Sequence, residues 1–426
     1  MARASLADAA RVQRTYLVLT LLSTLAASLI WGVNTLFLLD AGLTNAEAFA
    51  ANAFFTGGEV IFEVPTGVLA DVRGRRVSYL LGAATLLLST LLYLMMWRIH
   101  APFFGWAIAS MLLGLGFTFF SGATDAWLVD ALAFTQFEGK LDAVFARAQT
   151  VSGIAMLVGS VAGGFVAQLT NLGVPYVLRS ILLALTLVVA FFLMHDLGFT
   201  PARGKGPLVE IRRVVRASVD EGWRKPPIRW LMLSAPFTTG VGIYAFYALQ
   251  PYLLELYGDK AAFGVAGLAA AIIAGTQILG GLTVPLLRRV FKRRTQVLMV
   301  GAVTSIGCLS IIGRTTSFWV AIAALLVWGL AFSAVTPVRQ AYLNGLIPSA
   351  QRATVLSFDN LMGSAGGVIA QPALGRAADV FGYPVSYLLS AAISLAALPF
   401  LALARRENAS SDRIEEPEPG HHPTGA

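Results

Sequence analysis

Long apolar segments, separated by short polar connections, occupy nearly the whole chain from Tyr16 to Ala404. Each holds about 20 predominantly apolar residues, the length that an α-helix needs to cross the hydrocarbon core of a bilayer. The predicted spans are Tyr16–Asp40, Ala46–Ala70, Val77–Trp97, Pro102–Leu128, Asp142–Thr170, Pro175–Met194, Ile228–Tyr257, Ala262–Leu287, Thr295–Gly313, Ser317–Leu343, Arg352–Arg376 and Pro384–Ala404. The pattern therefore predicts an all-α membrane protein with twelve transmembrane helices.

The two halves of the chain repeat one another. Residues 159–164 read Gly-Ser-Val-Ala-Gly-Gly, and residues 363–367 read Gly-Ser-Ala-Gly-Gly. Repeats of six plus six helices are typical of secondary transporters, whose substrate site lies between the halves near the midplane of the bilayer. We therefore expect two pseudo-symmetric six-helix bundles.

The expected domains are an N-terminal bundle at 1–195, a cytoplasmic central loop at 196–227, a C-terminal bundle at 228–404 and a disordered cytoplasmic tail at 405–426. Within the central loop, apolar residues recur at helical spacing between Leu208 and Trp223. This spacing predicts an amphipathic helix on the membrane surface, with Arg212, Arg213 and Arg216 toward lipid headgroups.

Composition agrees with a membrane protein, since the chain is 57% hydrophobic and only 13% charged, with a mean hydropathy of +0.71. With the N-terminus in the cytoplasm, few of the 31 basic residues fall on the outer side. Those few are Arg98, Arg179, Lys260, Arg314 and Arg376. This asymmetry predicts a multi-pass protein of the inner (plasma) membrane with both termini cytoplasmic. It also explains the pI of about 9.8 without a nucleic-acid partner. We expect a monomer in the bilayer.

Several classes of site are absent from the sequence. Cys308 is the only cysteine, so disulfides within the chain and thiolate metal sites are excluded. The histidines form no constellation of metal ligands, no phosphate-binding loop follows a strand, and no nucleophile–His–acid set is present. We therefore expect no enzyme, no cofactor and no metal.

A short charged segment, Gly67–Arg76, lies between the second and third apolar segments and reads Gly-Val-Leu-Ala-Asp-Val-Arg-Gly-Arg-Arg. It resembles the loop signature of the major facilitator superfamily, which joins transmembrane helices 2 and 3. Gly67, Asp71, Gly74, Arg75 and Arg76 fit that signature, whereas Val72 stands where a basic residue is usual.

The resemblance implies the fold of that superfamily and a gating role for the loop. The loop Asp, here Asp71, is expected to cap a helix of the other half. The loop Arg, here Arg75, is expected to pair with an acidic residue at the cytoplasmic end of helix 4, for which Asp130 is the candidate. Such a latch would hold the outward-open state and break as the cytoplasmic side opens. The alternative is that Arg75 and Arg76 only set the topology.

The fifth span carries a second resemblance, to the antiporter pattern of bacterial drug and metabolite efflux members of the superfamily. Gly159, Ser160, Gly163 and Gly164 follow that pattern, with Ser160 in place of the usual proline. Small residues at this spacing allow close helix packing, which is also a common structural feature. An Arg before the glycines of helix 4, usual in drug–proton antiporters, is missing.

Ionisable residues inside the membrane are costly and therefore informative. Glu59 and Glu63 lie one helical turn apart in the second span, at roughly 16 Å and 10 Å from its cytoplasmic end. A carboxylate at the depth of Glu59 is costly to ionise, so we expect it to carry the coupling proton. We expect Glu63, Asp125 and Arg147 to form a charge-paired cluster, which has a structural or a functional role.

The substrate cavity of this superfamily is lined largely by helices 1, 4, 7 and 10. Aromatic and amide side chains on these helices suit an amphipathic or aromatic small molecule. The expected substrate-binding residues are Asn34, Phe120, Tyr244, Tyr247, Gln250 and Phe332.

The sequence thus favours a secondary active transporter that exports amphipathic small molecules, such as drugs or a metabolite, by proton antiport with alternating access. An importer or facilitator of a small organic solute is the alternative among transporters. A membrane sensor or scaffold that does not transport is the alternative of another class.

Overall fold

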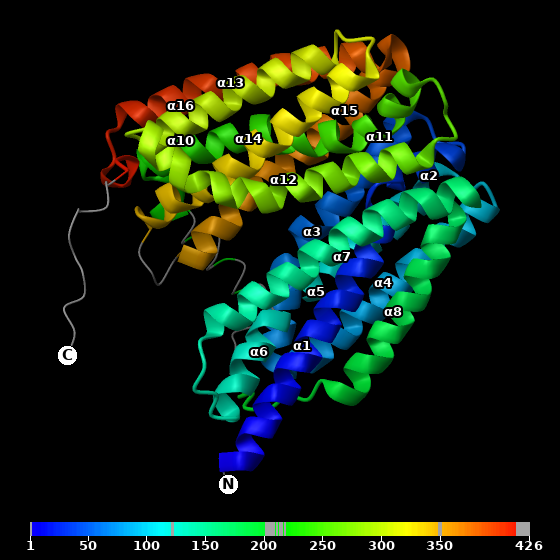
Figure 1. Ribbon diagram of the computed structural model, residues 1–426. Helices are drawn as coiled ribbons and strands as arrows, with labels where there is room; N and C mark the ends of the chain where they lie inside the picture. Colours follow the sequence, from blue (N-terminus) through cyan, green and yellow to red (C-terminus); the bar gives the residue numbers. More distant parts are fainter. Residues whose placement is uncertain are drawn as a thin grey trace.

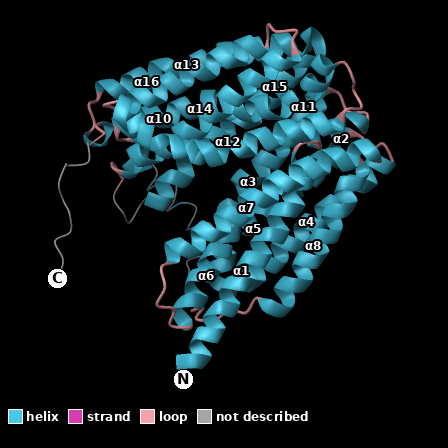
Figure 2. Ribbon diagram, in the orientation of Figure 1, coloured by secondary structure: helices cyan, strands magenta, loops and turns pink. Residues whose placement is uncertain are grey.

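The computed structural model describes residues 2–120, 123–200, 209, 212, 216, 219–347 and 352–414. The regular structure in these residues is helical, as Figure 2 shows, apart from one isolated bridge between Arg293 and Arg413. The central loop, where an amphipathic helix is expected, lies largely outside the described residues. Its end forms a short π-helical turn, η1 (Val219–Trp223).

The first half contains α1 (Ala2–Trp31), α2 (Asn34–Asp40), α3 (Asn45–Arg73), α4 (Arg75–Arg98), α5 (Phe103–Phe120), α6 (Ala123–Phe134), α7 (Leu141–Leu169) and α8 (Gly173–Leu193). The predicted first span consists of α1 and α2, and the fourth of α5 and α6. At the start of α3, the Thr44 hydroxyl and the Glu47 carboxylate each accept a backbone N–H of the other residue, which forms a capping box.

The second half contains α10 (Pro226–Ala235), η2 (Pro236–Gly240), α11 (Val241–Tyr257), α12 (Phe263–Val290), α13 (Arg294–Ile312), α14 (Phe318–Asn344), α15 (Arg352–Leu395), α16 (Ala397–Arg406) and η4 (Ser410–Asp412). The seventh span consists of α10, η2 and α11. Element α15 joins two spans at Gly382, whose φ of 81° and ψ of 165° interrupt the helix.

Eleven helical segments of the described residues are long and apolar enough to cross a membrane, and the last of them, Val355–Arg406, contains the two spans joined at Gly382. The prediction of twelve transmembrane helices in two six-helix bundles is therefore confirmed. The individual domain boundaries stay a prediction.

The two bundles converge at one end of the molecule and diverge at the other, where α1 begins and α16 ends (Figure 1). We call these the distal end and the terminal end. The connections at 41–44, 258–262 and 313–317 lie at the distal end, and the connections at 135–140 and 291–293 lie at the terminal end.

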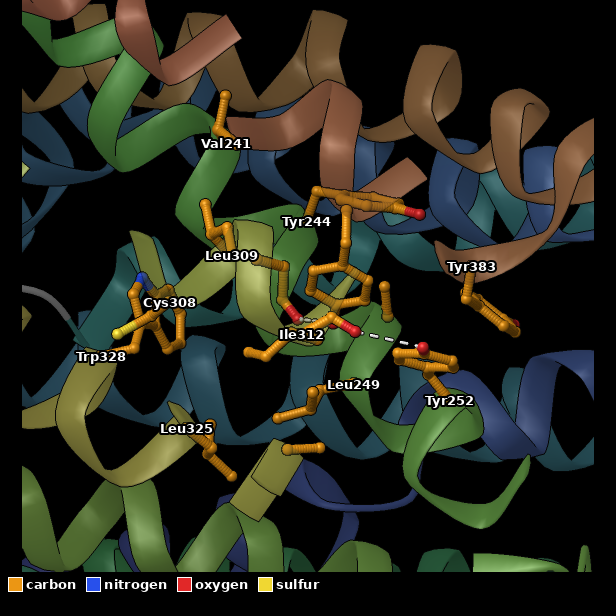
Figure 3. Close-up of a cluster of buried hydrophobic side chains, with 14 of the residues drawn as sticks. Val241, Tyr244, Leu249, Tyr252, Cys308, Leu309, Ile312, Leu325, Trp328 and Tyr383 are labelled. Carbon is orange, nitrogen blue, oxygen red and sulfur yellow. Dashed lines mark hydrogen bonds between the residues drawn. The ribbon is translucent and has the colours of Figure 1, made fainter. Parts of the chain in front are cut away.

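Each bundle has its own apolar core. In the second bundle, aromatic residues of α11 and α15 pack together, and the Tyr252 hydroxyl donates to the carbonyl of Ile312 at 3.1 Å (Figure 3). Tyr244 lies in the same cluster, fully buried, and its hydroxyl donates to Ser386 Oγ at 2.7 Å. These hydroxyls are satisfied within the protein, as burial requires.

The tail expected to be disordered from 405 is ordered as far as Ile414. Asp412 is 1% exposed, and its carboxylate accepts the backbone N–H of Thr295 at 2.8 Å and the Thr295 hydroxyl at 3.0 Å. It thereby satisfies free N–H groups at the start of α13. Glu and Pro residues beyond position 414 misled the prediction, because composition does not reveal a single capping carboxylate. Residues 415–426 lie outside the described part.

Candidate functional site

A cavity of about 630 Å³ lies between the halves. From the first half it is lined by residues of α1, α3, α5, α6 and α7, and from the second by Ser357, Asn360, Leu361 and Ser364 of α15. Asp125 and Gln149 line it and are exposed, so the cavity is open to solvent. We call it the central cavity.

Two smaller cavities adjoin it and share Glu59 with it. One, of about 290 Å³, is lined by Asn34, Asn52, Arg179, Tyr247 and apolar or aromatic residues, mostly of the first half. We call it the polar side cavity. The other, of about 280 Å³, lies against α11 and α14 and includes Tyr247 and Phe332. Among the described residues, Glu59 is therefore the one carboxylate that lines the central cavity and both side cavities.

Close packing of α3 against α5 fixes the position of Glu59. A Cβ on Gly58 would stand 2.7 Å from the carbonyl oxygen of Met111, and a Cβ on Gly114 would stand 2.9 Å from the backbone nitrogen of Glu59. Glycine at both positions lets the two backbones touch. The Glu59 side chain is partly exposed to the cavities and accepts no hydrogen bond from a described residue. It is available to bind a proton or a cationic group.

The expected cluster of Glu63, Asp125 and Arg147 is not formed. Glu63 and Asp125 both line the central cavity, and the Tyr16 hydroxyl donates to Asp125 Oδ1 at 2.7 Å. Arg147 is exposed on α7, outside the cavity lining, and forms no ion pair with a described residue. Asp125 and Arg147 were expected at similar depths along their helices, but Arg147 does not face the cavity that Asp125 lines.

Arg179 of α8 was expected near the outer surface, but it is 2% exposed inside the first bundle. Its Nε donates to Thr90 Oγ1 at 3.1 Å and its Nη1 donates to the carbonyl of Ala26 at 3.3 Å. It lines the polar side cavity and a further cavity of about 290 Å³. Its position as the seventh residue of an apolar helix, four residues after a buried proline, was the only sequence signal for this placement.

Four of the six expected substrate-binding residues line cavities: Asn34, Phe120, Tyr247 and Phe332. Asn34 also joins a buried chain of hydrogen bonds, in which its amide donates to Asn52 and its carbonyl accepts from Tyr176. Phe120 stacks on Tyr79 with ring centroids 4.4 Å apart. These side chains are already held in place by the protein, as a binding site requires.

The other two, Tyr244 and Gln250, line none of these cavities. Gln250 instead accepts the backbone N–H of Thr35 at 3.0 Å and donates to the carbonyl of Trp31 at 2.8 Å. These groups lie where α1 gives way to α2, so Gln250 satisfies the backbone at that break. The Gln250 amide is hydrogen-bonded, but its partners are backbone groups of the other bundle and not a substrate.

The second half has its own cavity of about 450 Å³, lined by Arg339, Asp359 and Asn360 among others. Arg339 and Asp359 form an ion pair, with Asp359 7% exposed. Arg339 also donates to the carbonyl of Leu231 at 3.1 Å. Neither residue was among the expected site residues.

The loop between α3 and α4 has a conformation that only its glycine allows. Gly74 has φ of 105°, and a Cβ there would overlap the carboxylate of Asp196. Asp196 Oδ1 accepts the backbone N–H of Arg76 at 2.8 Å, while Arg76 Nη2 donates to the carbonyl of Phe191 at 2.6 Å. Gly67 and Gly74 thus differ, since a Cβ on Gly67 would meet no atom within 4 Å.

The expected latch is not formed in this structure. Arg75 Nη1 lies 2.5 Å from Asp71 Oδ1 within the loop, and Asp130 forms no ion pair with a described residue. Arg75 is paired instead with Asp71 and not with Asp130 of the same bundle. The bundles diverge at the terminal end, where Asp71 was expected to cap a helix of the other half. A latch between the halves would have to form in another conformation.

At the distal end, by contrast, hydrogen bonds join the halves. Asp379 of α15 accepts the backbone N–H groups of Asn45 and Ala46, each at 2.9 Å, at the start of α3. Tyr383 donates to Asn45 Oδ1, and Gln168 Oε1 accepts the N–H of Gly264 at 2.9 Å. The distal end is therefore closed.

The small residues of α7 pack as expected from their spacing. A Cβ on Gly163 would overlap the carbonyl oxygen of Leu29, and one on Gly164 would stand 2.8 Å from Cα of Gly267 in the other bundle. Gly159 faces Ser28 equally closely. Ser160 is buried and its carbonyl approaches Gly267. This stripe forms a close contact of α7 with both α1 and α12.

Within the described residues, no group of three or more His, Cys, Asp or Glu side chains could hold a metal ion.

Comparisons with known proteins agree with this architecture. The family model of the Major Facilitator Superfamily matches residues 16–290 and 263–425. An uncharacterized MFS-type transporter of Methanocaldococcus jannaschii is 19% identical over 379 residues, which cover 89% of this chain and 94% of that protein.

Solved structures with the same fold include the nucleoside transporter NupG, with a TM-score of 0.76 at 11% identity, covering 92% of this chain and 98% of that one. The POT family transporter PepTSo has a TM-score of 0.72 at 13% identity, covering 93% and 98%. The human organic anion transporter MFSD10 has a TM-score of 0.64 at 15% identity, covering 92% and 99%. At these identities the likeness shows the fold alone.

Proposed function

The chain belongs to the major facilitator superfamily of membrane transporters, and we propose that it exports amphipathic small molecules in exchange for protons. The observation that carries the proposal is the position of Glu59, a single carboxylate shared by the central cavity and both side cavities. A proton and a substrate that enter these cavities would meet at the same side chain.

The cavity walls support an amphipathic substrate. Trp31 stacks on Phe246 with ring centroids 4.7 Å apart, and Phe55 meets Phe117 edge to face at 5.7 Å. Both pairs line the side cavities around Glu59. Aromatic walls with few polar groups bind a ligand through apolar area and orient it through a small number of hydrogen bonds.

The conformation fits one half of an alternating-access cycle. The distal end is closed by bonds between the bundles, and the central cavity is open to solvent. If the terminal end is cytoplasmic, as the distribution of Lys and Arg predicts, this is the state that takes substrate from the cytoplasm. The plasma membrane and cytoplasmic termini are part of the proposal.

Export is favoured by the small-residue stripe of α7, whose spacing resembles that of antiporters. The close approach of Gly164 to Gly267 supports its role as a tight contact between the bundles. Import of a small organic solute is the opposite direction of the same cycle, so the test must measure direction.

The test is proton-gradient-driven transport in proteoliposomes of known protein orientation, with a panel of radiolabelled amphipathic compounds and with the gradient imposed in either direction. Glu59→Gln keeps the side-chain volume and imitates the protonated form. It should abolish accumulation against a gradient while leaving exchange of substrate for substrate.

Glu47→Gln is the matched control, because Glu47 lies on the same helix but caps its start at the distal end. It should keep coupled transport. Coupled transport by Glu59→Gln would reject Glu59 as the proton site. Antiport would be rejected if the substrate accumulated only in the compartment toward which protons flow.

A further inference from the structure

We propose that the polar side cavity holds a zwitterionic aromatic substrate, with its carboxylate on Arg179 and its ammonium group on Glu59. The inference rests on the proposed function, since it assigns a substrate class to the same site. It makes Arg179 a substrate-binding residue.

Arg179 is a buried cation that lacks an acidic partner. It is 2% exposed, it forms no ion pair with a described residue, and its two hydrogen bonds go to a hydroxyl and a carbonyl. Removal of a charged group from water costs several kcal/mol unless an opposite charge compensates it. A guanidinium has five N–H donors, so several remain for another acceptor.

Arg339, which is only partly buried, shows how this fold treats an arginine that has a structural role. Its guanidinium is paired with Asp359 by two contacts, at 2.5 and 3.2 Å. The first bundle has no such carboxylate beside Arg179 among the described residues. The missing negative charge is instead one that a ligand in the cavity can supply, and a carboxylate matches the fork of the guanidinium.

The polar side cavity brings the charged groups of Glu59 and Arg179 to the walls of one small cavity. Glu59 and Arg179 both line it, yet they do not form an ion pair with each other. Trp31, Phe55 and Tyr247 are among its aromatic walls. A volume of about 290 Å³ suits a single aromatic molecule of the size of an amino acid rather than a large drug.

Arg179 can also be approached from the open side. A further cavity is lined by Arg179 together with Ser23, Phe120 and Ser152, and these last three residues also line the central cavity. An anionic group can therefore pass from the central cavity toward Arg179 along polar and aromatic side chains.

The arrangement explains exchange in physical terms. A substrate ammonium group and a proton compete for the carboxylate of Glu59, because each neutralises the same negative charge. The substrate carboxylate on Arg179 anchors the molecule while that competition takes place. Binding of the zwitterion should therefore release a proton from Glu59.

The experiment measures equilibrium binding to purified full-length protein in detergent, with three related probes. Tryptophan carries both charges, tryptamine only the cation, and indole-3-propionate only the anion. The variants are Arg179→Gln, Arg179→Lys, Glu59→Gln and, as a control, Arg314→Gln, which removes an exposed arginine at the distal end.

Tryptophan should bind the parent more tightly than either single-charge probe. Arg179→Gln should weaken tryptophan and indole-3-propionate by about tenfold or more and leave tryptamine unchanged. Glu59→Gln should weaken tryptophan and tryptamine and leave indole-3-propionate unchanged. Arg314→Gln should bind all three like the parent.

Equal losses for all three probes in Arg179→Gln would overturn the proposal, as would a parent that does not bind tryptophan at millimolar concentration. If Arg179→Gln does not fold, Arg179→Lys must show the same selective loss in smaller measure. The affinities of the three probes should be the same in gluconate buffer and in chloride buffer. If Arg179→Gln loses chloride binding but keeps the parent's affinities for the probes, the site binds an inorganic anion and the proposal is overturned. No proton gradient is used, so failure of coupled transport would remove the proposed function without altering this pattern.

Discussion

Arg339 and Asp359 form a bidentate ion pair inside the second bundle, with Nη2–Oδ1 at 2.5 Å and Nε–Oδ2 at 3.2 Å. The pair joins α14 to α15, and Arg339 also donates to the carbonyl of Leu231 on α10. Three helices of one bundle are thereby held together by two side chains. Glu59 and Arg179 also line cavities, but neither forms an ion pair with a described residue.

Loss of one partner of this pair should be costly. Asp359→Ala leaves the partly buried Arg339 guanidinium without its counter-charge, which should lower the free energy of unfolding by about 3 kcal/mol or less. The measurement is thermal or denaturant unfolding of purified protein. The double variant Arg339→Met/Asp359→Leu should recover most of that loss, and a parent-like Tm in Asp359→Ala would contradict the structural role.

Gly74→Ala should destabilise the loop between α3 and α4. The left-handed φ of 105° and the overlap of an added Cβ with Asp196 both act against a side chain there. Backbone strain of this kind costs about 1–3 kcal/mol. Gly67→Ala is the control, because Gly67 lies nearby inside α3 and an added Cβ there meets no atom within 4 Å. The measurement is the unfolding temperature of each variant. Equal unfolding temperatures would contradict the strain expected from a side chain at position 74.

Asp71→Asn and Arg75→Ala should slow transport and favour the conformation in which the terminal end is open. Their mutual pair is partly exposed here, so its loss should change stability little. The charges matter if they bridge the bundles when the terminal end closes. Labelling of a cysteine at Gln149, which lines the central cavity, should quicken in both variants, with Cys308 replaced by serine. Unchanged labelling together with full transport would reject the latch.

Tyr247→Ala should change substrate affinity, whereas Gln250→Ala should change stability. Tyr247 lines both side cavities, so its loss should weaken substrate affinity about tenfold, or roughly 1.4 kcal/mol. Gln250→Ala leaves the backbone groups of Trp31 and Thr35 without their partner and should cost about 1–3 kcal/mol of stability instead. Binding isotherms and unfolding curves separate the two effects. If Gln250→Ala loses substrate affinity at unchanged stability, Gln250 is a substrate-binding residue after all.

The amino-acid sequence by itself determined the helices, their number, the two-bundle repeat and the family. Each of these follows from local information: apolar length for a span, small residues for close packing, and a charged decapeptide for the loop. The depth of Glu59 in the second span also followed from the sequence, because distance along a helix is fixed by its rise per residue.

Only the tertiary structure decided which polar side chains meet. Arg147 shares its depth with Asp125 but lies on an exposed surface of α7, and Gln250 reaches the backbone of the other bundle. Arg179 was counted with the outer charges, yet it lies in the first bundle without an acidic partner. The rotation of each helix about its axis sets these contacts, and it depends on packing between helices far apart in the sequence. For the same reason the opening of the terminal end and the closing of the distal end by Asp379 are properties of the fold as a whole.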